Sequence, residues 1–211
     1  MYTRLMIIGG LFWSLTYILI IRRGFKDKTY GMPLAALCAN ISWEGVFSFI
    51  FPVSPVQLYI NYIWFLLDAI IVLQFLNYGK SEFPTLPYKK FYAMFLLALT
   101  TAFLLVLTIT MEFDDWQGAY AAFGQNLMMS VLFIVMLFSR DNLKGQSIYI
   151  ALFKMFGTGI SSLAFYLYQP ISQGSILFHF LFISIFVYDI IYVSLIYQKY
   201  REYNIPLWSR L

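Results

Sequence analysis

Residues 40–44 of the chain read NISWE, and they place Glu44 within an apolar stretch that extends over residues 31–51. A stretch of this length can cross a bilayer as one helix, because about 20 apolar residues span the hydrocarbon core. An acidic residue near the centre of such a helix costs roughly 2.5–3.5 kcal/mol, so it usually faces the interior of a bundle and has a function there. Asp68 and Asp189 lie in two further apolar stretches. Three carboxylates in three stretches indicate a polar pocket inside a helical bundle.

The composition is that of an integral membrane protein. Of the 211 residues, 61% are hydrophobic and only 11% are charged, whereas about 25% of the residues in a soluble domain are charged. Aromatic residues make up 21% of the chain, with 22 Phe, 17 Tyr and 5 Trp. They fit either lipid-facing Phe with interfacial belts of Tyr and Trp, or an aromatic cavity for a large apolar or cationic ligand.

Seven apolar stretches of about 18 or more residues are separated by short connections that contain Pro, Gly or charged residues. We expect transmembrane helices at roughly 4–21, 31–51, 56–78, 89–110, 117–138, 147–168 and 172–197. The connections leave no room for a soluble domain, so residues 1–211 are predicted to form a single all-α transmembrane domain. The first stretch has no small-residue cleavage site before Arg22 and Arg23, and we expect it to be retained as a helix.

The basic residues predict the orientation of the bundle. Twelve of the fourteen Lys and Arg residues lie in the first, third and fifth connections or after the seventh stretch. The alternate connections hold no basic residue, and the fourth contains Glu112, Asp114 and Asp115. The positive-inside rule then places the N-terminus outside and the C-terminus in the cytoplasm. The net charge of +4 is thus a topology signal. We expect lipid rather than nucleic acid as the partner, in the endoplasmic reticulum of a eukaryote or the plasma membrane of a bacterium.

Several polar and aromatic side chains share helix faces with the three carboxylates, because residues three or four apart lie on one side of a helix. These faces hold Asn40, Glu44 and Ser48 in the second stretch, Trp64 and Asp68 in the third, and Phe186, Asp189 and Tyr192 in the seventh. The fifth stretch adds two neighbouring amides, Gln125 and Asn126. Such groups either join helices through hydrogen bonds or line a cavity. With a rise of 1.5 Å per residue, the carboxylates lie at different depths, as along one elongated cavity.

A buried carboxyl group can act as a general acid, because removal from water favours its neutral form. Aromatic rings around it would stabilise a developing carbocation. Together these features suit the acid-initiated cyclisation of a lipophilic polyene. The same carboxylates would also serve a proton relay in a proton-coupled transporter. A seven-helix receptor or retinal-type photoprotein is a third alternative, which is disfavoured because the intramembrane lysine, Lys154, lies in the sixth stretch and the seventh carries Asp189.

The residues that commonly bind metals are scarce. Cys38 and His179 are the single cysteine and histidine of the chain, which excludes an intramolecular disulfide, a cysteine cluster and a multi-histidine site. Asp114 and Asp115 form one acidic pair without the second cluster of a magnesium–diphosphate site, and we interpret them as a solvated loop. Lys154 is expected either to snorkel or to form an ion pair. No metal or cofactor is expected.

In these residues the chain resembles the small integral-membrane terpene cyclases of meroterpenoid and indole-diterpene pathways. Residues 40–44 resemble the Trp-Glu motif of the family's second helix, and Trp64 with Asp68 resembles its third-helix pattern. Similar features follow in order at residues 125–130, Arg140, residues 145–147, Lys154, residues 157–158 and residues 188–192.

The resemblance implies a seven-helix enzyme that protonates a terminal epoxide, or sometimes an olefin, of a prenylated lipophilic substrate. Cyclisation would then proceed through carbocations without a metal. The essential Glu and Asp of the family would fall on Glu44 and Asp189, with Asp68 as a supporting acid or hydrogen-bond partner. The residues expected to contact the substrate are Asn40, Trp43, Trp64, Gln125, Asn126, Phe186 and Tyr192.

Overall fold

Seven α-helices and no strand form the described part of the chain in the computed structural model, which describes residues 1–53 and 55–211. The helices are α1 (Tyr2–Asp27), α2 (Leu34–Gly45), α3 (Pro55–Tyr78), α4 (Tyr88–Glu112), α5 (Ala119–Arg140), α6 (Ile148–Tyr168) and α7 (Ile176–Glu202). In the described residues six of them are long and apolar enough to cross a membrane, and α2 continues into a π-helical turn (Val46–Ile50) to form a shorter apolar helix. This confirms the prediction of an all-α membrane bundle of seven helices.

Two helices, α2 and α7, begin three and four residues later in the chain than their apolar stretches predict. Pro33 precedes the first residue of α2 and has an extended backbone, with φ −55° and ψ 141°. Proline fixes φ and lacks an N–H group, so it favours the start of a helix over its interior. Ser175 precedes α7, and its hydroxyl accepts a hydrogen bond from the N–H of Phe178 at 3.3 Å. A serine in this position satisfies one of the free N–H groups of the first turn.

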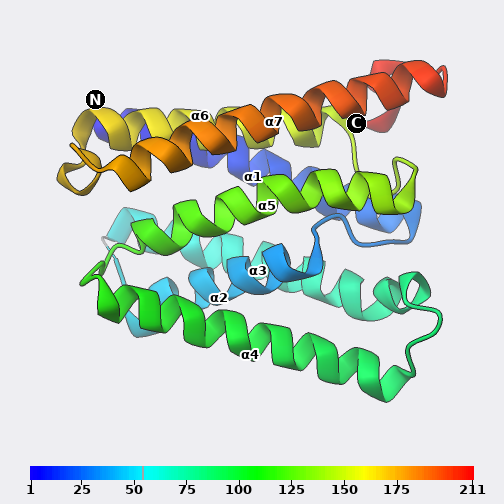
Figure 1. Cartoon of the computed structure of the whole chain (residues 1–211), viewed down its shortest axis with the longest axis horizontal. Helices are drawn as coiled ribbons and strands as arrows, with labels where there is room; N and C mark the ends of the chain where they lie inside the picture. The colour runs from blue at the N-terminus through cyan, green and yellow to red at the C-terminus, as the bar shows by residue number, and fades with distance from the viewer. Residues whose placement is uncertain (54) are drawn as a thin grey trace.

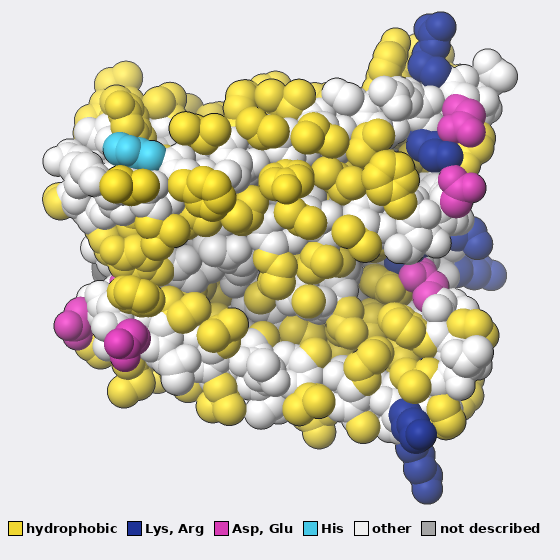
Figure 2. Space-filling view, viewed as in Figure 1, with side chains coloured by type: hydrophobic (Ala, Val, Ile, Leu, Met, Phe, Trp, Pro, Cys, Tyr) yellow, Lys and Arg dark blue, Asp and Glu magenta, His cyan; other side chains and the backbone are white. Residues whose placement is uncertain are grey.

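The helices alternate in direction, so the connections collect at two opposite ends of the bundle (Figure 1). The α1–α2, α3–α4 and α5–α6 connections lie at the end that holds the C-terminus, which we call the basic end. The N-terminus and the other three connections lie at the opposite, N-terminal end. Figure 2 shows the Lys and Arg side chains of this face at the basic end and a broad hydrophobic surface over the helices. A membrane protein requires this separation of charged ends from an apolar middle.

Helices α1 and α6 approach closely because small residues face each other. A Cβ atom added to Gly157 of α6 would lie 2.8 Å from Cδ1 of Trp13 and 3.2 Å from the carbonyl oxygen of Gly9 in α1. A side chain at either glycine would therefore separate the helices. Small residues at interfaces are typical of membrane bundles, where close van der Waals packing replaces the hydrophobic effect as the driving force.

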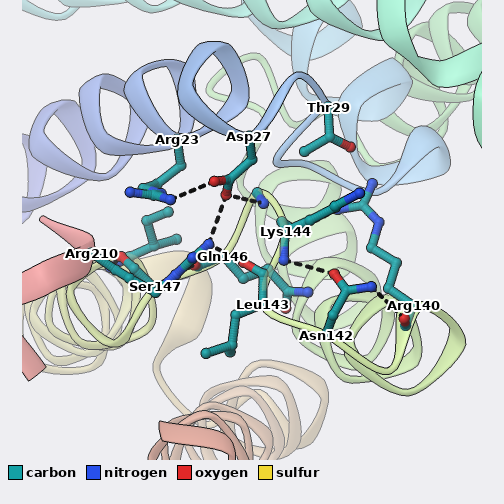
Figure 3. A network of polar contacts seen from close by, with 12 residues as sticks. Arg23, Asp27, Thr29, Arg140, Asn142, Leu143, Lys144, Gln146, Ser147 and Arg210 are labelled. Carbon is teal, nitrogen blue, oxygen red and sulfur yellow. Dashed lines mark hydrogen bonds and ion pairs between the residues drawn. The ribbon is translucent and has the colours of Figure 1, made fainter. Parts of the chain in front are cut away.

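A network of polar contacts joins three segments at the basic end (Figure 3). Asp27, at the end of α1, pairs with Arg23 at 2.5 Å and Arg210 at 2.7 Å, and it accepts a hydrogen bond from the N–H of Gly145 at 2.9 Å. Arg210 also donates to the carbonyl oxygen of Leu143. Burial lowers the pKa of Arg210, and the charge of Asp27 opposes this shift. The network ties the end of α1 and the α5–α6 connection to the C-terminal segment.

Replacement of Arg210 by Ala should lower stability by about 1.5–3 kcal/mol, the usual contribution of a hydrogen bond to a charged group. The melting temperature in detergent should fall, and proteases should cleave the C-terminal segment faster. Arg201→Ala is a matched control, because Arg201 is exposed and forms no ion pair among the described residues. Equal melting temperatures for the two variants would contradict the stabilising role of Arg210.

Candidate active site

A cavity of about 440 Å³ lies between α1, α2, α3, α5 and α6. This volume falls within the range of about 300–1,000 Å³ that small-molecule sites occupy. Its wall is rich in aromatic rings, and four of the five tryptophans of the chain line it. The rings in its interior belong to Trp13, Tyr17, Trp43, Trp64, Phe123 and Phe165. The alternative of an aromatic cavity is thus realised in the fold, alongside Phe side chains on the outer surface.

Glu44 lies in the wall of this cavity and is 3% exposed. Its Oε2 atom is buried without a hydrogen-bond partner in the described part of the chain. A buried polar group usually has a partner, because an unsatisfied one costs about 1–3 kcal/mol. The helix changes to the π-helical turn at Val46, directly after the turn that carries Glu44. Such π-helical turns often occur at functional sites.

Asp68 lies behind the cavity wall and reaches it through its neighbours. It is fully buried, and its Oδ2 atom accepts a hydrogen bond from Nδ2 of Asn40 at 2.9 Å. The same amide group of Asn40 also donates to the hydroxyl of Tyr17. Asn40 and Tyr17 line the cavity, whereas Asp68 does not. Because Asn40 lies one helical turn from Glu44, the two acids belong to one polar cluster between α2 and α3.

Helix α5 supplies the two predicted amides to the same cavity. Nε2 of Gln125 donates to Oδ1 of Asn40 at 3.3 Å, and Oδ1 of Asn126 accepts a hydrogen bond from the hydroxyl of Thr158 at 3.3 Å. The Oε1 atom of Gln125 is buried without a partner among the described residues. Gln125 and Asn126 thus lie in the wall of the same cavity as Asn40 and Glu44.

Two tryptophans are held in the cavity wall by their indole N–H groups. Nε1 of Trp43 donates to the carbonyl oxygen of Gly118 at 2.9 Å, and Nε1 of Trp64 donates to Oγ of Ser14 at 3.0 Å. The Trp43 ring also packs on Phe47, with ring centroids 4.8 Å apart. A buried indole whose N–H is satisfied keeps a fixed orientation. The two rings therefore present fixed surfaces toward the interior.

Replacement of Gly118 by Ala should displace Trp43 from the cavity wall and reduce stability. Gly118 has φ +71°, and an added Cβ would lie 2.3 Å from the ring of Phe47 and 2.7 Å from Nε1 of Trp43. Overpacking of this kind costs about 1–3 kcal/mol. The melting temperature in detergent measures this effect. Gly124→Ala is the control, because nothing lies within 4 Å of its added Cβ; equal effects of the two changes would contradict this account.

Asp189 belongs to a different polar group from Glu44. It pairs with Lys154 at 2.6 Å, and Nζ of Lys154 also donates to Oγ of Ser130 at 2.7 Å. Asp189 and Lys154 are 1% and 0% exposed. Of the two alternatives for Lys154, the structure shows the ion pair and not snorkelling. The group joins α5, α6 and α7, and none of its three residues lines the cavity.

The structure does not bring Phe186 and Tyr192 to the cavity. Phe186 is 49% exposed and lines a separate open groove between α6 and α7. Tyr192 is buried, and its hydroxyl donates to Oε1 of Gln146 at 2.9 Å. Both residues were expected at the cavity because they share a helix face with Asp189. Asp189, however, pairs with Lys154 and does not line the cavity.

Sequence reasoning missed several residues of the cavity wall. Trp13 and Tyr17 of α1 line it, and so do Phe123 and Phe165 of α5 and α6. The spacing of Trp13 and Tyr17 puts them on one face of α1, which was a signal for this side of the cavity. No comparable signal distinguished the two phenylalanines from the many others in the chain.

A family model described as Pyr4-like transmembrane terpene cyclases matches residues 1–203. The chain is 34% identical over 147 residues to "Pyr4-family terpene cyclase mfmH" of Annulohypoxylon moriforme, an alignment that covers 68% of this chain and 61% of that protein. It is 29% identical over 166 residues to "Terpene cyclase macJ" of Penicillium terrestre, covering 75% and 64%. With "Terpene cyclase pyr4" of Aspergillus fumigatus the identity is 25% over 208 residues, covering 92% and 84%.

The chain spans less than two thirds of the length of the mfmH and macJ proteins. No solved structure matches it. The family model nevertheless extends from α1 to the residue after α7, and thus over all seven helices that surround or support the cavity. The chain belongs to the Pyr4-like transmembrane terpene cyclase family.

Proposed function

We propose that this protein is a membrane-bound terpene cyclase in which Glu44 protonates an epoxide, or an olefin, of a prenylated lipophilic substrate. The observation that carries the proposal is the position of Glu44. It is a buried carboxyl group with an unsatisfied oxygen in the wall of an aromatic cavity. Membership of a family of terpene cyclases supports the same reaction class.

The proposed reaction needs one proton donor and no group that leaves the substrate. Glu44 transfers its proton to the epoxide oxygen, the adjacent C–O bond breaks, and a tertiary carbocation forms on carbon. The π electrons of the next double bond attack this cation and close a ring. The last cation loses a proton, so the product has the same mass as the substrate. In this scheme Glu44 starts as the neutral acid and ends its first step as a carboxylate.

The other cavity residues would guide this sequence. The faces of Trp13, Trp43 and Trp64 would stabilise the passing cation, at about 0.5–2 kcal/mol for each ring in contact. Asp68 would hold Asn40 and thereby orient the polar cluster beside Glu44. The ion pair of Lys154 and Asp189 would fix the helices around the cavity rather than supply the proton. We propose that the reaction proceeds without a metal, since Glu44 is the acidic side chain that the described cavity wall offers.

Membership of a terpene cyclase family, rather than the shape of the cavity, favours a cyclase over the alternative of a proton-coupled transporter. The described lining of the cavity extends from the N-terminal end to the level of Asn40 and Tyr17, and it includes no residue of the connections at the basic end. A transporter with alternating access also has a cavity that is open to one side at a time. By the positive-inside rule, we further propose that the cavity opens on the side away from the cytoplasm.

The test is to incubate membranes that contain the protein with epoxyfarnesyl and epoxygeranylgeranyl aromatic substrates. A product of unchanged mass and altered retention would support the proposal, and membranes without the protein are the control. The unepoxidised substrates, run in parallel, distinguish protonation of an epoxide from protonation of an olefin. Proton-coupled uptake by proteoliposomes without cyclised product would support the transporter instead.

A further inference from the structure

The mouth of the cavity differs from its interior. Gln57 lies in the first turn of α3, Gln117 in the α4–α5 connection and Gln169 directly after α6, and all three line the cavity. These positions lie at the N-terminal end of the bundle (Figure 1), and we call the end of the cavity that the three amides line its mouth. An amide side chain both donates and accepts hydrogen bonds. The mouth is thus lined by neutral hydrogen-bonding groups and the interior by aromatic rings.

Trp116 adds a flat surface beside these amides. It lines the cavity, is 51% exposed, and packs edge-to-face on Phe51 with ring centroids 5.1 Å apart. The connection that carries Trp116 and Gln117 is well anchored, because the buried Asp115 accepts a hydrogen bond from the N–H of Tyr120 at 2.7 Å. Burial raises the pKa of Asp115, while the backbone N–H groups of this connection counteract the shift. The mouth is therefore formed before a ligand arrives.

The charges around the mouth exclude one class of ligand group. No Lys, Arg or His is among the described residues that line the cavity. Outside the lining, the exposed acidic residues Glu112 and Asp114 lie in or next to the connection that holds Gln117, and the exposed Arg4 follows Thr3 in α1. An anionic group such as a diphosphate or a carboxylate that enters the cavity would lose its hydration without gaining a cationic partner from the described wall.

The distance from the mouth to Glu44 suits a folded terpenoid chain. Glu44 lies six residues before Ile50 at the end of the π-helical turn, or roughly 10 Å below the mouth at the rise of a helix. Thr158 lies eleven residues before Gln169 in the same lining, or roughly 17 Å deep. A ligand can therefore fill the aromatic interior around Glu44 while its other end remains at the mouth.

We propose that the mouth binds the non-terpenoid head of the substrate, and that Trp116, Gln117 and Gln169 are the residues that select this head. A planar head stacks on Trp116 and its substituents bond to Gln117 and Gln169, whereas Nε2 of Gln57 already donates to Oδ1 of Asn61 at 2.8 Å. The terpenoid chain then extends inward, so that its distal end meets Glu44. This inference rests on the proposed function, which identifies the substrate as a terpenoid. It adds that the mouth selects the non-terpenoid head.

Kinetic comparison of three substrates tests the proposal. They share one epoxidised terpenoid chain and carry a hydroxylated aromatic head, a carboxylated head or a plain phenyl head. In the Gln117→Leu/Gln169→Leu variant, the loss of two neutral hydrogen bonds should raise KM for the hydroxylated substrate about tenfold and leave kcat within about twofold. KM for the phenyl substrate should not rise, and the carboxylated substrate should be the poorest for the wild type. Gln173→Leu is the matched control, because Gln173 is exposed in the α6–α7 connection and does not line the cavity.

Unchanged selectivity between the hydroxylated and phenyl heads in a folded variant would overturn the assignment of the mouth. Failure of the wild type to cyclise any of the substrates would instead contradict the proposed function. Photolabelling separates the two, because it needs no turnover. A non-reactive analogue without the epoxide, with a diazirine on its head, should label peptides that contain Trp116–Gln117 or Gln169. Labelling confined to peptides around Asn40 or Asn126 would place the head in the interior and overturn the proposal.

Discussion

Replacement of Glu44 by Gln is expected to lower the rate of cyclisation by about 100- to 10,000-fold, the usual contribution of a positioned general acid. The amide is nearly the same size as the carboxyl group, so the cavity should keep its shape, but it carries no proton acidic enough to open an epoxide. Binding of the substrate should change little, and the loss should appear in kcat. Single-turnover product formation and binding of a non-reactive analogue measure the two quantities separately.

The control for this change is a second acid-to-amide replacement outside the cavity. Asp114→Asn alters an exposed residue of the α4–α5 connection and should retain the native rate. Asp68→Asn is an informative intermediate, because Asp68 holds Asn40 but does not line the cavity. We expect a smaller loss for Asp68→Asn than for Glu44→Gln. A folded Glu44→Gln protein that cyclises its substrate at the native rate would refute the assignment of the acid.

Removal of one partner of the ion pair between Lys154 and Asp189 should destabilise the bundle by about 3–5 kcal/mol, because the remaining charge stays buried without compensation. Both side chains are at most 1% exposed, and the pair joins α6 to α7. Asp189→Asn and Lys154→Met should each lower the melting temperature in detergent strongly. The double change Lys154→Met with Asp189→Leu removes both charges and should recover most of the loss.

This series also separates a structural role of Asp189 from a catalytic one. Single variants of Asp189 should lose activity whether or not Asp189 takes part in the chemistry, since the bundle around the cavity is destabilised in either case. Activity of the stable double variant would show that Asp189 acts through the fold. A stable but inactive double variant would instead support a catalytic role for Asp189. Single variants with the same melting temperature as the wild type would contradict the stabilising role of the ion pair.

The seven-helix fold and the polar residues of α2 in the cavity wall could be predicted because their signals are local. Length and apolar composition decide where a chain crosses a membrane, and the alternation of basic connections follows from the same physics. The sequence also predicted that Asn40 and Glu44 lie together, since residues one turn apart share a helix face. Buried polar residues are costly in lipid, so these positions marked the interior without help from tertiary structure.

The contacts between helices were decided by the tertiary structure alone. In water the apolar face of a helix identifies its buried side, but in a bilayer lipid and core are equally apolar, so hydrophobic periodicity does not reveal how a helix is rotated. Phe186 therefore lies in an outward groove although it shares a face with Asp189. Asp189 itself meets Lys154 rather than Glu44, and Asp68 stands behind Asn40. Residue types and depth follow from the sequence, whereas the partner of each buried charge depends on how seven helices pack.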